Sequence, residues 1–199
     1  LNFPWSEDLG SKRLINLLYN YEYINSSSKL NDKKKLDNII FFHIQRVLFD
    51  FNIKKISEIS SFDIIAYVMS SLIINKINNR KIEYIKFIIE NQIDKLGMHK
   101  SYNILEHSKF INNLNELKNI LLFFNMKQSN YFDEIILKMT SILNQYFHND
   151  GTLALFNGAN NIYTKIIYNS LNKDTYLAKR DFTNVNNGIA FYGDKNKKL

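Results

Sequence analysis

Apolar residues along the first three quarters of the chain recur at helical spacing. The clearest run lies between residues 32 and 52, where Leu36, Ile40, Ile44, Val47 and Phe51 follow one another at intervals of three and four. That period is typical of a helix with one buried face. The same pattern predicts helices over residues 5–23, 32–52, 61–77, 80–93, 112–125, 131–147 and 162–171. Residues 61–77 are apolar nearly all round, so we expect that helix to lie between neighbours.

The pattern changes near the C-terminus. From residue 181 onward, Val185, Ile189 and Phe191 alternate with the turn pairs Asn187-Gly188 and Gly193-Asp194, which favours short strands joined by tight turns. We therefore predict an all-α domain over residues 1–178, followed by the first strands of a β domain over residues 179–199. Because the first residue is Leu and the last ones follow a strand-like run directly, we expect the chain to be a fragment.

Two segments interrupt the helices. Residues 145–160 read QYFHNDGTLALFNGAN, with an apolar core between the turn pairs Asp150-Gly151 and Asn157-Gly158. Short irregular segments of this kind often carry ligand-contacting groups. A helix-loop-helix connection with a hydrophobic plug is the alternative, and the local pattern alone favours it.

The other interruption, at residues 94–107, gathers polar groups. It reads DKLGMHKSYNILEH and brings His99, Tyr102, Asn103, Glu106 and His107 close to Gly97. These side chains can exchange protons and donate hydrogen bonds, and they precede a helix, so they are candidates for a site. A zinc site from His99, His107 and Glu106 matches no known metal spacing. We therefore predict no metal and no cofactor.

The remaining histidines are less informative. His43 lies in an apolar helix face, which favours a packing role, whereas His148 precedes the Asp150-Gly151 turn and leaves both interpretations open.

Charge and composition narrow the function classes. The net charge is +7, but the lysines are scattered, so nucleic-acid binding is not predicted; an acidic polysaccharide would be attracted equally well. Cysteine is absent, which excludes disulfides and thiolate zinc sites. No apolar run approaches the ~20 residues that span a bilayer. The sequence gives no oligomeric state.

Three motifs together resemble the helical domain of heparinase II/III-like proteins, in the form common in alphaproteobacteria. The most specific is FHNDGTLALFNG at 147–158, which is similar to a family segment written R-H-G-D-G-x-L-A-L-F-N-G. GMHKSYNILEH at 97–107 is similar to the family's D-G-G-H-x-S-R-x-P-x-Y-H element. Trp5, Leu9, Arg13 and the residues that follow resemble its opening helix.

This resemblance implies an incomplete (α/α) toroid of antiparallel helix pairs, joined to a β-sandwich that begins near Phe182. It also implies β-elimination on uronate-containing glycans in the cell envelope or periplasm. In that reaction the uronate carboxylate is neutralised, a base removes the α-proton, and an acid protonates the leaving oxygen. The expected catalytic residues are His99, His107 and Tyr102. The expected substrate-binding residues are Asn103, Glu106, Asp150 and Asn157.

The sequence departs from the family at two positions of the 97–107 motif. Characterised lyases carry a tyrosine where Glu106 stands and a proline where Ile104 stands, and the Asn-His pair expected on an earlier helix has no counterpart near residues 62–72. A catalytically inactive carbohydrate-binding relative is therefore the alternative. A helical protein-interaction scaffold is a third interpretation, which predicts that the 97–107 and 148–158 segments lie apart.

Overall fold

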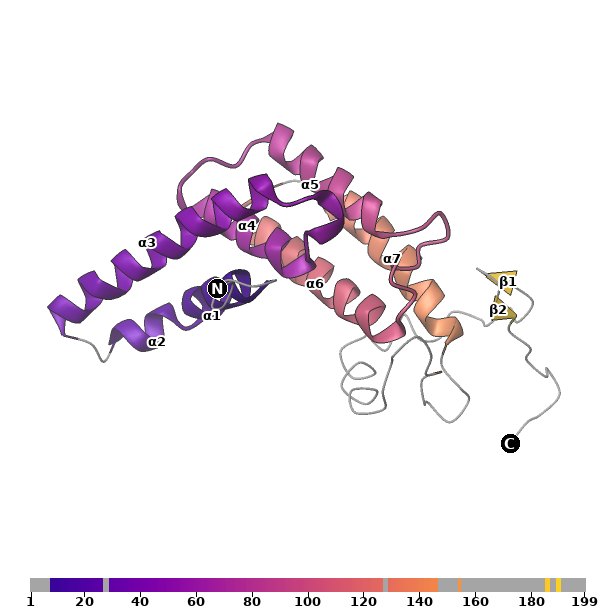
Figure 1. Ribbon diagram of the computed structural model, residues 1–199, viewed down its shortest axis with the longest axis horizontal. Helices are drawn as coiled ribbons and strands as arrows, with labels where there is room; N and C mark the ends of the chain where they lie inside the picture. Colours follow the sequence, from indigo (N-terminus) through magenta and orange to yellow (C-terminus); the bar gives the residue numbers. More distant parts are fainter. Residues whose placement is uncertain are drawn as a thin grey trace. The chain divides into compact units, whose positions relative to one another are not determined.

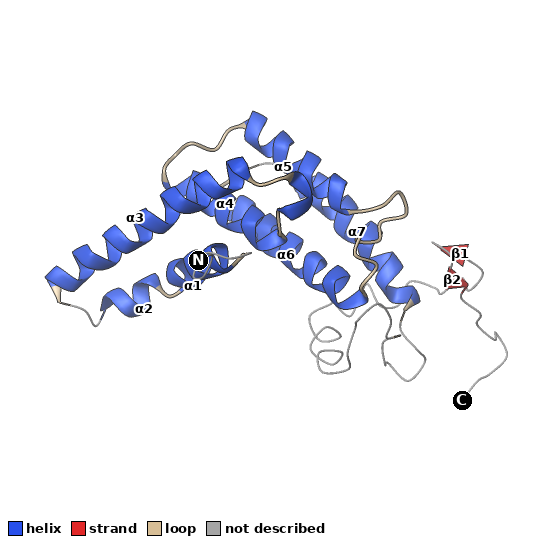
Figure 2. Ribbon diagram, in the orientation of Figure 1, coloured by secondary structure: helices blue, strands red, loops and turns tan. Residues whose placement is uncertain are grey.

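The computed structural model describes residues 8–26, 29–126, 129–146, 154, 185–186 and 189–190. This part of the chain is mostly helical (Figures 1 and 2). The helices are α1 (Leu9–Tyr19), α2 (Tyr21–Ser26), α3 (Leu30–Ile53), α4 (Ser61–Ile73), α5 (Asn79–Gln92), α6 (Ile104–Phe123) and α7 (Ser129–Gln145), with a 3-10 turn at Ile56–Glu58. None of the helices in the described ranges is long and apolar enough to cross a membrane.

The predicted helices at 32–52, 80–93 and 131–147 are confirmed within a few residues as α3, α5 and α7. The prediction of a single helix over 5–23 is wrong, because the chain breaks at Asn20 into α1 and α2. The Asn20 side-chain amide donates to the Asn16 carbonyl at 2.8 Å, and such local bonds compete with a continuous helix. The predicted start near Ser6 and the predicted helix at 162–171 lie outside the described residues.

Asparagine ends two helices earlier than expected. Asn75 and Asn125 adopt φ values of 52° and 56°. In each case the next N–H reaches back to a carbonyl five residues earlier, Lys76 to Ser71 and Met126 to Leu121, both at 2.8 Å. This is the Schellman arrangement, which terminates a helix with a left-handed residue. It stops α4 at Ile73, short of the predicted residue 77.

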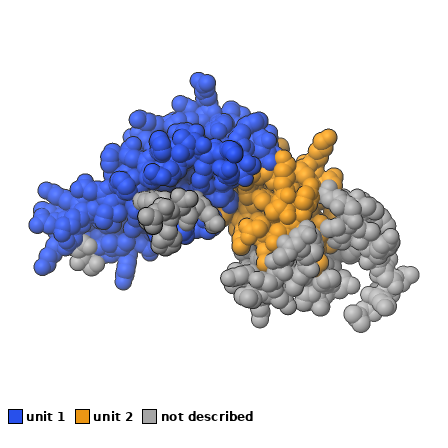
Figure 3. Space-filling model, viewed as in Figure 1, with its two compact units in different colours: residues 1–91, 116–127 blue, residues 92–115, 128–199 orange. Residues whose placement is uncertain are grey.

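The chain forms two compact units (Figure 3). Unit 1 comprises Leu1–Asn91 and Glu116–Lys127, and unit 2 comprises Gln92–Asn115 and Gln128–Leu199. Helix α6 contributes residues to both. The single helical domain predicted over 1–178 thus contains a division that the hydrophobic pattern did not indicate.

Unit 1 is built around α4. This helix packs against α1 and α3, which also contact each other, and it is buried on nearly all sides as predicted. The Phe51 ring of α3 stacks on the Tyr67 ring of α4 with centroids 4.0 Å apart. Packing a largely apolar helix between two amphipathic ones buries the α4 surface that water would otherwise contact.

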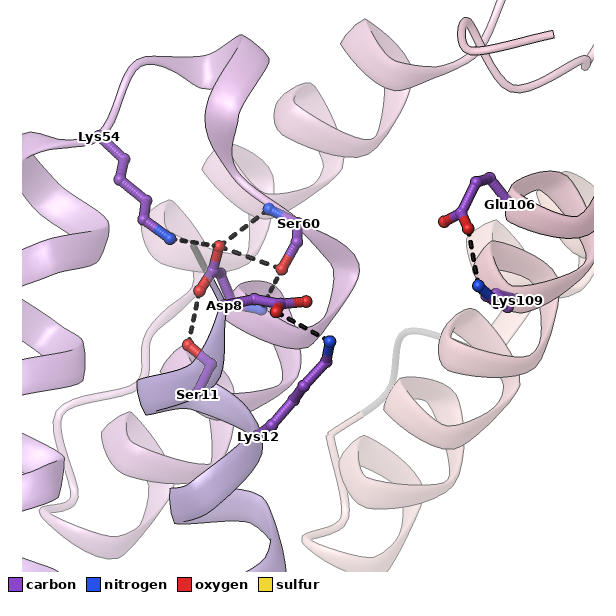
Figure 4. Close-up of polar contacts among 8 residues, drawn as sticks. Asp8, Ser11, Lys12, Lys54, Ser60, Glu106 and Lys109 are labelled. Carbon is purple, nitrogen blue, oxygen red and sulfur yellow. Dashed lines mark hydrogen bonds and ion pairs between the residues drawn. The ribbon is translucent and has the colours of Figure 1, made fainter. Parts of the chain in front are cut away.

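The buried carboxylate of Asp63 fixes the start of α4, and its partners Ser11, Lys54 and Ser60 are labelled in Figure 4. Asp63 completes a capping box with Ser60 and accepts a hydrogen bond from the Ser11 hydroxyl of α1. Lys54, just beyond α3, lies 2.7 Å from Asp63 Oδ2. One side chain therefore ties together α1, the end of α3 and the N-terminus of α4.

Unit 2 contains α7, the first half of α6 and the loop before α6. Among its described residues, fully buried apolar side chains include Met98, Ile104, Ile111, Leu114, Phe132, Met139 and Leu143. Strands β1 (Val185–Asn186) and β2 (Ile189–Ala190) pair antiparallel, with Val185 opposite Ala190. These two-residue strands lie within the region where strands are predicted, and the start of a β-sandwich there stays a prediction.

Candidate functional site

The loop between α5 and α6 is a small closed hairpin. Ile93 and His99 form an antiparallel bridge, and the Lys100 N–H donates to the Gln92 carbonyl at 2.9 Å. At the tip, Asp94 Oδ1 accepts from the N–H groups of the residues at 96, 97 and 98, each at 2.9 Å. A carboxylate that takes three backbone donors leaves the loop little conformational freedom.

Gly97 is required at this tip for two reasons. Its φ is +103°, a conformation that residues with a side chain rarely adopt. An added Cβ would also lie 2.9 Å from Lys138 Cγ of α7. The glycine therefore allows the loop to approach α7 closely.

His107, in the first turn of α6, binds the loop from its buried side. Its side chain is fully buried. Ring atom Nδ1 accepts from the His99 N–H at 3.1 Å, and Nε2 lies 2.9 Å from the Met139 carbonyl of α7. Because a backbone N–H can only donate and a carbonyl can only accept, the neutral ring carries its proton on Nε2.

Burial also sets the charge state of His107. Desolvation lowers the pKa of this imidazole to about 4, although the Met139 carbonyl opposes the shift. The ring is thus neutral near pH 7, buried, and bonded at both nitrogens. These contacts give His107 a structural role in joining the loop, α6 and α7, and its expected catalytic role stays a prediction.

His99 is oriented by the residues that follow it. Its Nδ1 accepts from the Ser101 N–H at 3.2 Å and lies 2.8 Å from the Ser101 hydroxyl. That hydroxyl in turn accepts from the Asn103 N–H at 3.2 Å. The ring packs against Phe110 with centroids 5.1 Å apart. Since Nδ1 is the acceptor, the neutral ring is protonated at Nε2.

The environment of His99 keeps it neutral. The ring is half-buried, and burial lowers the pKa of this imidazole, while the charge of Glu106 partly opposes the change. Unlike His107, His99 has no hydrogen-bond partner at Nε2 among the described residues. It therefore presents a neutral N–H donor on a rigid loop.

Tyr102 adopts a strained backbone beside His99. Its φ is 51°, in the left-handed region that costs a non-glycine residue on the order of 1 kcal/mol. A turn hydrogen bond of 2.9 Å from its N–H to the His99 carbonyl holds this conformation. The side chain is 38% exposed. Strain maintained beneath an exposed aromatic side chain is typical of ligand-contacting positions.

Asn103 and Glu106 have different environments. Asn103 Oδ1 accepts from the N–H groups of Leu105 and Glu106, at 2.9 and 3.2 Å, and so begins α6. This cap corrects the predicted helix start at residue 112, because α6 begins at Ile104 and includes Glu106 and His107. The Glu106 carboxylate is half-exposed and lies 2.7 Å from Lys109 Nζ (Figure 4).

The structure thus brings five of the seven predicted site residues into one loop and the helix turn after it. Asp150 and Asn157, the other two, lie outside the described residues. In their segment only Ala154 is described, and its N–H donates to the Tyr146 carbonyl at 2.7 Å. That the 97–107 and 148–158 segments share one site stays a prediction.

Sequence reasoning missed two contributors to this loop. Asp94 was included only as the boundary of the segment, although an Asp three residues before a Gly is a recognisable turn signal. Tyr146 is buried, and burial together with the charge of Asp94 raises the pKa of its hydroxyl. No local pattern distinguishes Tyr146, which directly follows α7, from the aromatic residues within that helix.

No group of three or more His, Asp or Glu side chains that could hold a metal ion occurs in the described ranges. Comparison of the chain with protein-family models, with curated proteins and with solved structures finds no match.

Proposed function

We propose that this chain belongs to a polysaccharide lyase-like protein that cleaves uronate-containing glycans by β-elimination. The loop from Asp94 to Asn103, together with the first turn of α6, is the part of its site that contacts the sugar. In this proposal the helices belong to an (α/α) toroid, β1 and β2 begin a β-sandwich, and the protein acts in the cell envelope.

The observation that carries the proposal is the state of His99. Its ring is neutral, its orientation is fixed through Nδ1, and Nε2–H is the remaining donor. A preorganised donor of this kind suits the uronate carboxylate, because a hydrogen bond to the carboxylate stabilises the charge that develops when the α-proton leaves. The sequence resemblance of residues 97–107 and 147–158 supports the same reaction.

Tyr102 is the proposed proton carrier. Its side chain is exposed beside His99 on the same turn. A tyrosine oxygen within hydrogen-bond reach of the sugar can take the α-proton and pass a proton to the leaving glycosidic oxygen, so that the C–O bond breaks as the C=C bond forms. His107 acts through His99 in this scheme, since it bonds to the His99 backbone and has no exposed surface. The net charge of +7 favours approach of a polyanionic chain.

A second function, binding of acidic glycans without cleavage, is favoured by Glu106. This residue stands where lyases of the resembled family carry a tyrosine, and its carboxylate pairs with Lys109. A carboxylate held in an ion pair lacks the tyrosine hydroxyl that exchanges the proton at that position in the resembled lyases, so the loop could bind a glycan without cleaving it. The two functions share the loop and differ in whether a product forms.

The test is to incubate the intact protein with a panel of acidic polysaccharides and to follow the ultraviolet absorbance of the unsaturated product. We expect product formation that falls by about 10²- to 10⁴-fold in His99→Ala and in Tyr102→Phe, and that is unchanged in the control His43→Ala on α3. Binding without product would favour the second function. Neither binding nor product on uronate-containing glycans would contradict both.

A further inference from the structure

Helix α3 is apolar on two opposite faces. One face packs into unit 1 through Ile40, Ile44, Val47 and Phe51, all of which are buried. The opposite face carries Ile39, Phe42, Phe49 and Ile53, which are 49%, 59%, 57% and 64% exposed. A helix that is apolar on both sides normally lies between two partners. In the part of the chain that the structure describes, the first face is buried and the four apolar residues of the second are about half exposed or more.

The exposed face has the spacing of a helix-pairing seam. Its members are Ile39, Phe42, Arg46, Phe49 and Ile53, so the intervals are three, four, three and four. This is the repeat by which two helices pack side by side. We call these five residues the outer stripe of α3.

The outer stripe also reads the same in both directions, as Ile-Phe-Arg-Phe-Ile. A two-fold symmetric interface requires that if residue i contacts residue j, then j contacts i. An antiparallel pair of identical helices meets this condition when the stripe is palindromic. Phe42 of each copy then lies opposite Phe49 of the other, and Ile39 lies opposite Ile53.

We propose that the outer stripe of α3 is a self-association surface, on which a second copy of this chain packs its own α3 antiparallel. Arg46 lies at the two-fold axis, and the aromatic pairs flank it.

The charges of the stripe are complementary in this arrangement. Within one copy, Arg46 Nε lies 2.8 Å from Asp50 Oδ2, and the guanidinium lies 5.7 Å from the Phe49 ring centroid. The arginine thus stays against the apolar stripe. Since a helix rises about 1.5 Å per residue, Asp50 of each copy lies about 6 Å along the axis from both arginines, in opposite directions. Each Arg46 is then flanked by two carboxylates.

The area is sufficient for a specific contact. An aromatic side chain has roughly 150–250 Å² to bury, so an exposed Phe42 or Phe49 contributes on the order of 100 Å². With the two isoleucines and Arg46, each copy loses roughly 500 Å². The total of about 1,000 Å² lies at the lower end of specific interfaces. We therefore expect a dimer that dissociates on dilution.

The first test is the mass of the whole chain in solution, followed by light scattering or sedimentation across a concentration series. The chain is expected to pass from monomer to dimer as concentration rises. Phe42→Ser should keep it monomeric over that range. The control Phe87→Ser changes a 50%-exposed phenylalanine on α5 and should leave the dimer intact. A circular dichroism spectrum establishes that each variant is folded.

Cysteine cross-linking then tests the orientation, and the natural chain contains no cysteine to interfere. Arg46→Cys places the thiol at the proposed axis on the contact line itself, where two Cα atoms come within the ~4.4–6.8 Å of a disulfide, so this variant should cross-link under mild oxidation. In Ile39→Cys the two sulfurs are about 20 Å apart along the helices, so this variant alone should not. An equal mixture of Ile39→Cys and Ile53→Cys should give the mixed dimer.

Three results would overturn the proposal. They are a wild-type chain that stays monomeric at every concentration, a dimer that Phe42→Ser leaves unchanged, and cross-linking of Ile39→Cys by itself, which indicates a parallel pair.

Discussion

The backbone N–H of His99 donates to Nδ1 of His107, eight residues further along the chain, at 3.1 Å. The first histidine is half-exposed and the second is fully buried. This single bond couples the candidate sugar-contacting side chain to the core of unit 2. The position of His99 therefore depends on a residue that no ligand can reach from the surface.

His107→Ala should destabilise the protein. The change leaves the His99 N–H and the Met139 carbonyl without their partner and creates a cavity at a fully buried position. We expect the free energy of unfolding to fall by about 2–4 kcal/mol, measured by urea denaturation. The half-buried His43 on α3 provides the control, and His43→Ala should cost clearly less. An equal decrease in the free energy of unfolding of the two variants would contradict the stabilising role given to the His107 hydrogen bonds.

Stability should fall in acid because of His107. Its pKa is about 4 in the folded chain and 6.5 when unperturbed, so between these values the unfolded chain binds more protons. The contribution is complete above pH 6.5, and it decreases as pH falls toward 4, by a total on the order of 3 kcal/mol. Burial also lowers the pKa values of His43 and His99, which adds to the slope.

Urea denaturation of the wild type and of His107→Ala, each from pH 7 to pH 4, isolates the contribution of His107 to the pH dependence of the free energy of unfolding. The variant should lose less stability than the wild type over that range. Parallel curves for the two proteins would contradict the assignment of the acid sensitivity to His107.

Tyr102→Gly should separate stability from function. Glycine adopts the φ of 51° observed at this position without strain, so we expect the free energy of unfolding to stay within about 1 kcal/mol of wild type or to rise. Product formation on the acidic glycan should nevertheless be lost with the hydroxyl. A variant with wild-type activity would exclude Tyr102 as the proton carrier, whatever its stability.

Asp63→Ala should be among the most destabilising polar changes in unit 1. The carboxylate is nearly inaccessible to solvent. It accepts hydrogen bonds from the Ser11 hydroxyl and the Ser60 N–H, and it forms an ion pair with Lys54. Removing one partner of a buried ion pair typically costs about 3–5 kcal/mol. The control is Glu58→Ala, which breaks a pair with Lys55 that is exposed on both sides and should cost less than about 1 kcal/mol. Thermal melting of both variants would reveal the difference, and similar shifts would refute the role given to Asp63.

Local pattern decided most of the secondary structure. The apolar period of three and four is a property of the chain itself, so it predicted α3, α5 and α7 closely and indicated that α4 would be buried on all sides. It also identified residues 94–107 as the place where polar groups interrupt the helices. These features need only neighbours along the sequence, because helical periodicity and turn preferences are local.

Tertiary structure decided which of these residues are accessible and where helices end. His99 and His107 look equivalent in the sequence, but contact with Met139, 32 positions away, buries one and leaves the other half-exposed. Asn103 and Asn75 look alike too, yet one begins a helix and the other ends one. Burial and the choice between caps depend on packing partners distant in the chain, and no local pattern specifies those partners.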